Sequence, residues 1–152
     1  MLIERDELCA LIPHAGNMCL LDGVQAWDDQ RILCISNSHR HTDNPLRCFY
    51  GVEQAPGALS AIHAVEYGAQ AMAVHGGLLA RQAGGTAAPG YLAALRDVQL
   101  KVTSLDSIHD ALFVEAEQVM AGTGSLMYNL RVYSSAGDIV TARATVITPV
   151  QQ

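Results

Sequence analysis

Residues 57–80 are predicted to form one long helix that is apolar on every side, and this constrains the fold more than any other feature of the chain. The apolar residues of this segment are Ala58, Leu59, Ala61, Ile62, Ala64, Val65, Ala69, Ala71, Met72, Ala73 and Val74. They cover every face of a helix instead of one stripe, and a helix of that kind is buried. Ser60 can cap its regular part. The glycines at 76–77 should weaken its far end and those at 84–85 should end it.

The rest of the chain is predicted to consist mainly of strands. Short apolar or alternating segments indicate strands at 20–27, 31–36, 91–102, 111–120, 126–133 and 139–147. A short helix at 5–11 precedes them, and a polar loop at 37–55 leads to the long helix. The last three strands follow one another through short turns, which is typical of an antiparallel meander. A curved antiparallel sheet around one buried helix is the hotdog fold, an α+β architecture, and we expect one such domain over residues 1–152.

Composition excludes several classes of protein. The net charge is −6 with histidine neutral, and no run of Lys or Arg occurs, which argues against a general nucleic-acid binder. No charge-free apolar stretch approaches the roughly 20 residues of a membrane span. Residues 1–6 mix acid and base without an apolar segment, so we expect no secretion signal. Only 16% of residues are charged, which indicates that another subunit covers some of the apolar surface.

The four cysteines are Cys9, Cys19, Cys34 and Cys48. None forms a C-x-x-C pair, and their spacings match no zinc module. We interpret them as reduced, mostly buried thiols of a cytoplasmic protein, with a reactive cysteine nucleophile as the alternative.

Two sequence motifs resemble a known family. Ile12-Pro13-His14, followed by the segment 18–24 (Met-Cys-Leu-Leu-Asp-Gly-Val), resembles the L-P-H…L-L-D-x-V opening of bacterial β-hydroxyacyl-(acyl carrier protein) dehydratases. Residues 66–70 (Glu-Tyr-Gly-Ala-Gln) resemble their E-x-x-A-Q motif on the central helix. With residues 73–77 (Ala-Val-His-Gly-Gly), the chain is most similar to the hotdog dehydratases of aryl-polyene biosynthesis. The resemblance implies a dehydratase that forms a trans-2-enoyl thioester in fatty-acid or polyene-type biosynthesis, without a metal or redox cofactor.

One departure from the family pattern affects the catalytic residues. The fatty-acid dehydratases carry a catalytic histidine in a G-H-F-P-G loop, 14 residues before the motif glutamate. In this chain that position is Val52, after Gly51. The resemblance therefore implies the catalytic role of the family glutamate for Glu66. It gives no residue for the role of the usual histidine partner, which must be sought elsewhere in the chain.

Removing water from a 3-hydroxyacyl thioester needs a base at C2, an acid for the leaving hydroxyl, and donors for the thioester oxygen. We expect Glu66 to be desolvated on its apolar helix, and a desolvated carboxyl holds its proton to higher pH, as an acid requires. We expect His14 to be the base, with His63, on the same helix face as Glu66, as the rival. The helix start from Gly57 to Ala64 offers backbone N–H groups and a positive dipole for the oxygen.

The remaining polar residues receive weaker interpretations. Gln70 lies one turn after Glu66 and can orient its carboxyl or bind a water, with helix–sheet packing as the alternative. His39 and His41 are expected to be solvated in the polar loop, and a metal site there would need a third ligand. His75 and His109 are expected at the surface or at an interface.

The substrate is expected on an acyl carrier protein or coenzyme A, and an acidic carrier needs a basic docking patch. Candidates are Arg47, Arg81, Arg96 and Lys101. We expect a homodimer, or a heterodimer with a second hotdog protein, formed by pairing edge strands. Two other functions stay open. One is a hotdog thioesterase in which Glu66 and Gln70 activate water, and the other is a non-catalytic subunit of a heteromeric dehydratase.

Overall fold

The computed structural model describes residues 1–13, 16–47, 57–85 and 90–148. In chain order its elements are β1 (Ile3–Glu4), α1 (Arg5–Ala10), η1 (Gly16–Met18), β2 (Gly23–Trp27), β3 (Arg31–Ser36), η2 (Ser38–Arg40), η3 (Ala61–His63), α2 (Ala64–Gln82), β4 (Tyr91–Leu100), β5 (Leu112–Gly122), β6 (Ser125–Ser134) and β7 (Gly137–Ile147). None of the helices in these ranges is long and apolar enough to cross a membrane.

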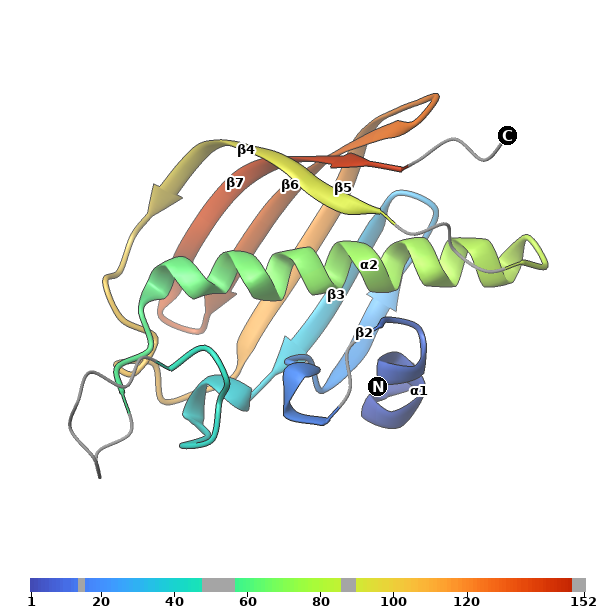
Figure 1. Cartoon of the computed structure of the whole chain (residues 1–152). Coiled ribbons are helices and arrows are strands. Elements are labelled where there is room, and N and C mark those ends of the chain that lie inside the picture. The colour runs from blue at the N-terminus through green and yellow to red at the C-terminus, as the bar shows by residue number, and fades with distance from the viewer. Residues whose placement is uncertain (14–15, 48–56, 86–89, 149–152) are drawn as a thin grey trace.

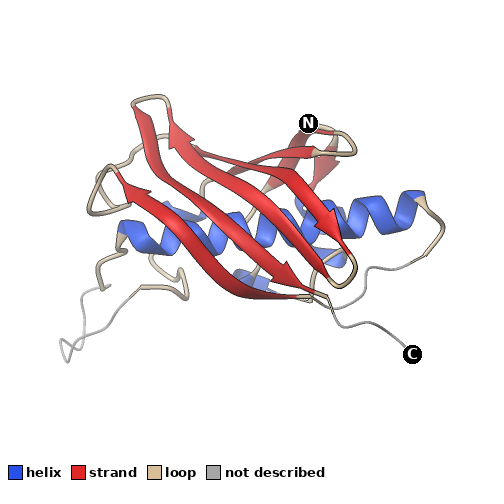
Figure 2. Cartoon of the chain, turned by 90° about the horizontal axis from the view of Figure 1, so that it is seen from above, coloured by secondary structure: helices blue, strands red, loops and turns tan. Residues whose placement is uncertain are grey.

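Within the described residues, seven strands form one antiparallel sheet in the order β1-β2-β3-β5-β6-β7-β4. The long helix α2 lies along one face of this curved sheet, and the short helix α1 lies beside β2 (Figure 1). The other face of the sheet carries no helix (Figure 2). The predicted architecture, a curved antiparallel sheet around one long helix, is therefore confirmed.

Alternation along the last strands decides which face holds the core. On β6, Tyr128, Leu130 and Val132 are buried under α2, whereas Asn129 and Arg131 point outward and are exposed, as the sequence pattern predicted. The helix comes very near this strand at Gly68. A Cβ atom there would lie 2.9 Å from Cδ1 of Leu130, so glycine permits the close helix–sheet contact.

The central helix begins later than the sequence suggested. Its regular part starts after Ser60, whose Oγ accepts the N–H of Ile62 at 3.3 Å, as expected for a cap. Residues 57–60 are instead extended, because Leu59 and Ala61 exchange backbone hydrogen bonds with residues 103–105. At the far end, Gly84 adopts φ +85° and the helix ends just before it, as predicted.

The helix runs unbroken through Gly76 and Gly77, contrary to the expected weak point. Gly77 packs against the residue that ends α1. A Cβ atom at Gly77 would lie 3.1 Å from the carbonyl oxygen of Leu11, so the glycine serves close packing between α1 and α2.

One side of α2 and most of β4 are open to solvent, which corrects the prediction of a helix buried all round. Glu66 and Ala73 of α2 are exposed, and Ile62 of η3, just before the helix, is 44% exposed. On β4, which forms one edge of the sheet, the large exposed apolar side chains are Tyr91, Leu92, Val98 and Leu100. The chain therefore presents an apolar edge strand, as expected of a subunit that pairs with another.

Two histidines expected to be solvated or at the surface are buried. His75 is fully buried, with Nε2 2.8 Å from the carbonyl oxygen of Asp28 and Nδ1 2.8 Å from the hydroxyl of Tyr128. His39 is buried as well, and its Nε2 lies 3.0 Å from the carbonyl oxygen of Ile108. His41 and His109 are exposed, as predicted.

Both ring nitrogens of His75 have a hydrogen-bond partner. A carbonyl oxygen only accepts, so Nε2 carries a proton and donates to the backbone carbonyl of Asp28; in the neutral ring Nδ1 accepts from the hydroxyl of Tyr128, and in the charged ring it donates to that hydroxyl. Burial lowers the pKa of His75 from its ordinary value of 6.5, although the carbonyl of Asp28 and the charges of Asp28 and Asp29 oppose the shift. The fold therefore favours the uncharged imidazole.

This burial predicts acid sensitivity. Below a pH of about 6.5 the unfolded chain binds a proton at residue 75 that the folded chain resists, so the free energy of unfolding falls as pH drops through that range. Urea unfolding at about pH 7.5 and about pH 5.5 measures the fall. His75→Gln should reduce this dependence without abolishing it, because burial also lowers the pKa of His39, whereas His41→Gln, at an exposed position, should leave it intact. Equal stability of the wild-type protein at both pH values would contradict the prediction.

Candidate active site

Glu66 lies in the first turn of α2, three residues after His63. Its side chain is exposed in the single chain, and that of His63 is half-buried. The prediction that the helix itself desolvates Glu66 is therefore wrong, because the apolar residues around it face the sheet and Glu66 faces away from it. A carboxylate in the first turn is favoured by the positive end of the helix dipole.

The start of the helix offers fewer free N–H groups than expected. The N–H groups of Leu59, Ala61 and His63 donate to the Asp106 carboxylate and to the carbonyls of Thr103 and Ser60, respectively. The carbonyl oxygen of Gly57 accepts from Nη1 of Arg47 at 3.1 Å. These bonds hold the residues before the helix rigidly, and substrate binding by Gly57 stays a prediction.

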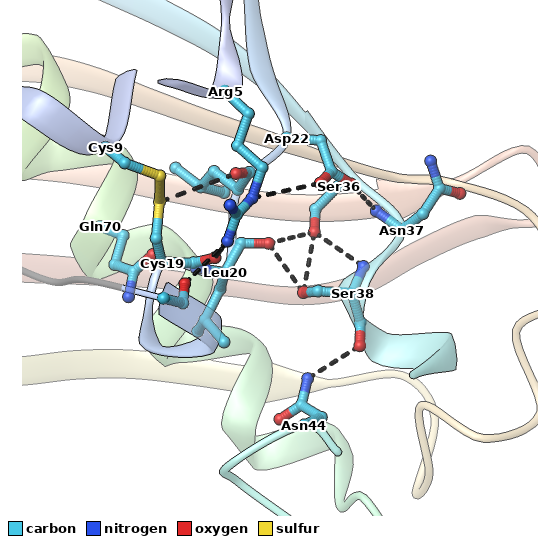
Figure 3. A network of polar contacts seen from close by, with 12 residues as sticks. Arg5, Cys9, Cys19, Leu20, Asp22, Ser36, Asn37, Ser38, Asn44 and Gln70 are labelled. Carbon is cyan, nitrogen blue, oxygen red and sulfur yellow. Dashed lines mark hydrogen bonds and ion pairs between the residues drawn. A yellow bond between two sulfur atoms is a disulfide. The ribbon is translucent and has the colours of Figure 1, made fainter. Parts of the chain in front are cut away.

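Gln70 is buried one turn beyond Glu66 and holds the segment that follows His14. Its Oε1 accepts the N–H of Leu20 at 2.8 Å, and its Nε2 donates to the carbonyl oxygen of Met18 at 2.7 Å. Both ends of the amide are thus bound to backbone, and Figure 3 shows the Gln70 side chain beside the segment that holds Cys19 and Leu20. His14 itself lies outside the described residues, but Gln70 anchors the chain four to six residues after it against α2.

Two further links fix the same segment. Arg5 donates from Nη2 to the carbonyl oxygens of Gly16 at 2.8 Å and Cys19 at 2.9 Å, and its guanidinium lies 3.9 Å from Asp22. Cys9 and Cys19 form a disulfide, which joins α1 to this segment (Figure 3). Residues 16–22 are therefore held from α1 and α2 together.

The disulfide corrects the prediction that the cysteines are reduced. The other described cysteine, Cys34, is free and buried, and burial raises the pKa of its thiol to about 12. At neutral pH that thiol is protonated and inert, which argues against the alternative of a reactive nucleophile at this position. Cys48 lies outside the described residues. The cytoplasmic location, which relied partly on reduced thiols, stays a prediction.

A buried polar network around Tyr67, the residue after Glu66, was not predicted from the sequence. The hydroxyl of Tyr67 lies 2.8 Å from Oγ of Ser38 and accepts from Nδ2 of Asn44 at 3.0 Å. The hydroxyls of Ser36 and Ser38 both donate to the carbonyl oxygen of Leu20. Burial raises the pKa of Tyr67, which stays protonated as a donor. The only signal in the sequence was the tyrosine of a buried helix, whose hydroxyl needs a partner.

Arg47 is a buried residue that holds neighbouring backbone segments together, and it is not a docking residue. Its side chain is only 8% exposed and donates to the carbonyls of His39 at 2.7 Å and Gly57 at 3.1 Å, and to Asp106 at 2.6 Å. Burial would raise the pKa of Asp106, but hydrogen bonds from the Leu59 N–H and from Arg47 lower it overall. The prediction that Arg47 docks a carrier protein is therefore wrong.

The other docking candidates differ from one another. Arg81 is exposed and pairs with Glu7 at 2.9 Å, whereas Arg96 and Lys101 are exposed at the β4 edge.

A pocket of about 390 Å³ lies beside the segment 16–22 and is lined in part by Arg5, Asp22 and Asn44. A second pocket, of about 470 Å³, lies at the β2–β3 turn. Glu66 lines neither of them, so its carboxyl faces an open side of the molecule.

The anchoring role of Gln70 predicts a local effect of mutation. Gln70→Leu should leave the Leu20 N–H and the Met18 carbonyl without partners, at a cost of about 1–3 kcal/mol. The Leu20 amide should then exchange its hydrogen at least roughly tenfold faster, as measured by NMR. Gln82→Leu, at the exposed end of α2, is the matched control. Unchanged exchange at Leu20 would show that Gln70 does not anchor this segment.

The curved antiparallel sheet and the single long helix, with Glu66 and Gln70 four residues apart on it, define a protein of the hotdog fold. The chain belongs to the ApeP-like dehydratase family, because the family model described as ApeP dehydratase matches residues 7–152. A search of curated proteins found no match to this chain.

Solved structures share the fold. The dehydratase heterocomplex ApeI:P from Xenorhabdus doucetiae is similar with a TM-score of 0.79 at 20% identity, over 95% of this chain and 91% of that chain. A mutant of thioesterase PA1618 from Pseudomonas aeruginosa has a TM-score of 0.63 at 13% identity, over 99% and 97%. A hypothetical thioesterase with coenzyme A from Streptococcus pneumoniae TIGR4 has a TM-score of 0.54 at 13% identity, over 85% and 86%. At these identities the similarity concerns the fold alone.

Proposed function

We propose that this protein removes water from a 3-hydroxyacyl thioester on an acyl carrier protein and forms the trans-2-enoyl thioester. Membership of a dehydratase family is the observation that carries the proposal. The position of Glu66 supports it, because the carboxyl lies in the first turn of the long helix, four residues before Gln70, which anchors the segment that follows His14. Coenzyme A is the alternative carrier of the acyl group.

In this proposal Glu66 and a histidine divide the proton transfers. His14 removes the proton from C2, and Glu66 gives a proton to the leaving hydroxyl. His63 is the alternative base, since it is half-buried and lies three residues before Glu66 on α2. The backbone at Gly57 would bind the thioester as charge develops on its oxygen. Gln70 would act through the segment 16–20 by keeping its backbone in place.

A second hotdog chain would complete this site. Glu66 and Ile62 are exposed in the single chain, and so are four apolar side chains of the edge strand β4. A partner that pairs with β4 would extend the sheet, bury these side chains and desolvate Glu66. The partner can be a second copy or a different hotdog protein. The heteromeric state of ApeI:P supports the second option.

One incubation separates the proposed activity from that of a thioesterase. Dehydration keeps the thioester intact, whereas a thioesterase releases a free thiol that a thiol reagent detects. With a 3-hydroxyacyl-coenzyme A as probe, we expect no thiol release above the uncatalysed rate. Release of thiol that depends on Glu66 would favour the thioesterase function and contradict the proposal.

A further inference from the structure

The outer face of the sheet carries one row of polar and charged side chains. Positive and negative charges are paired at one end of this row, but positive charge is left without a carboxylate at the other. Across the strands, Arg31 lies opposite Glu117, and Asn129 lies opposite Arg143, which in turn lies opposite Arg96 on β4. Glu117 and Asn129 are also direct neighbours, so these five residues form one continuous row. It runs from β3 to the edge strand.

The balanced end of this row is paired internally. Arg31 forms ion pairs with Glu115 at 2.8 Å and with Glu117 at 3.6 Å. These contacts raise the pKa of Arg31, chiefly through its hydrogen bond with Glu115. The guanidinium groups at the other end lack such partners. Arg143 donates to the amide oxygen of Asn129 at 3.3 Å, and among the described residues Arg96 has no hydrogen bond or ion pair.

Two arginines directly opposite each other on a sheet repel and destabilise the folded chain. Here they lie on the outer face at the open edge, whereas Leu92 and Leu100 of the same strand pair with Val146 and Val140 and lie exposed on the helix side of the sheet. An edge strand with charge on one face and exposed apolar side chains on the other suits an interface that a partner strand covers. The positive charge of Arg96 and Arg143 should therefore influence which strand can pair with β4.

A second copy of this chain fits poorly. Two copies that pair symmetrically along the whole of β4, Tyr91–Leu100, meet near its midpoint, which lies between Leu95 and Arg96. Both Arg96 side chains then lie opposite or diagonal to each other on the outer face, with an Arg143 behind each. The neighbouring Asp97 supplies one carboxylate per chain, so four guanidinium groups meet two carboxylates and positive charge remains.

We propose that Arg96 and Arg143 select the partner of β4, so that this chain pairs with a different hotdog protein whose edge strand presents carboxylates on its outer face. This rests on the edge pairing described under the proposed function, but it is independent of the dehydration chemistry. Each Arg–carboxylate pair across the strands favours that partner by about two- to fivefold over an uncharged one. Repulsion between the like pairs disfavours a second copy.

Mixing the protein with a charge-reversed copy tests the selection. In the Arg96→Glu/Arg143→Glu variant both exposed arginines become acids, so this variant serves as the probe for an acidic edge strand. Equal amounts of wild-type protein and variant, one of them carrying a mass tag, are analysed by native mass spectrometry at low and high salt. We expect mixed dimers well above the statistical share of one half at low salt, falling toward one half when salt screens the charges.

The matched control reverses an arginine of the same outer face away from the edge, Arg131→Glu on β6, and should give the statistical share. Thermal unfolding of each variant verifies that it is folded. A statistical mixture at both salt concentrations would overturn the proposal, and so would monomers in every sample. If charge reversal slowed turnover of an acyl carrier substrate without changing the mixed fraction, the pair would serve carrier docking and the proposal would be wrong. The mixed fraction itself is measured without the dehydration assay.

Discussion

Glu66→Gln should lower the rate of dehydration by about 100- to 10,000-fold, the range for loss of one general acid or base. Gln keeps the size and polarity of the side chain but cannot exchange a proton at the operating pH. Because Glu66 is exposed in the single chain, the substitution should change the free energy of unfolding by less than about 0.5 kcal/mol. The loss would therefore report on chemistry and not on folding.

Two further variants make the result specific. Glu66→Asp keeps a carboxyl in a shorter side chain and should retain part of the activity. Glu4→Gln removes an exposed carboxyl on β1, far along the chain, and should retain all of it. Rates are measured by following the enoyl product chromatographically, at saturating and at low substrate. A Glu66→Gln variant as fast as the wild-type protein would remove Glu66 from the mechanism.

Arg47→Met should lower the free energy of unfolding by about 3 kcal/mol. The substitution leaves three carbonyl oxygens, those of His39, His41 and Gly57, and the carboxylate of Asp106 without their guanidinium partner. These groups belong to the loop before the helix and to the segment that follows β4. Losing these hydrogen bonds should therefore loosen the chain that leads into α2 and also lower the stability of the whole fold.

Urea unfolding provides the measurement for Arg47, as a shift of the midpoint at constant slope. Arg40→Met is the matched control, because Arg40 lies in the same segment but is exposed, and the change should be within about 0.5 kcal/mol. If the two variants unfolded at the same urea concentration, Arg47 would not hold this loop.

The sequence predicted the fold because each element carried its own periodic signal. Residues on every face of α2 are apolar, and Tyr128, Leu130 and Val132 alternate with polar neighbours on β6, so the helix and its sheet followed directly. Only the two-residue strand β1 left no such signal. The start of α2 was placed too early because residues 57–60 pair with residues 103–105, a contact that no local pattern reveals.

The site was harder to predict, because its side chains depend on distant partners. His75 is buried through contacts with Asp28 and Tyr128, 47 and 53 residues away, so its burial could not be read locally. Gln70 was placed correctly one turn from Glu66, but its bonds to Met18 and Leu20 needed the packing of an N-terminal segment on α2. In the proposed assembly a second chain desolvates Glu66, and the pattern of one chain cannot specify that contact.

The most direct test of the dehydratase function is intact-mass spectrometry of a 3-hydroxyacyl-(acyl carrier protein) incubated with this protein. The test is performed with the protein alone and after addition of a second hotdog protein. We predict that the carrier-bound acyl group loses the mass of one water while the thioester stays intact, and that Glu66→Gln prevents this loss. A carrier protein whose mass stays unchanged in both incubations, or one that loses its whole acyl group, would contradict the proposed function.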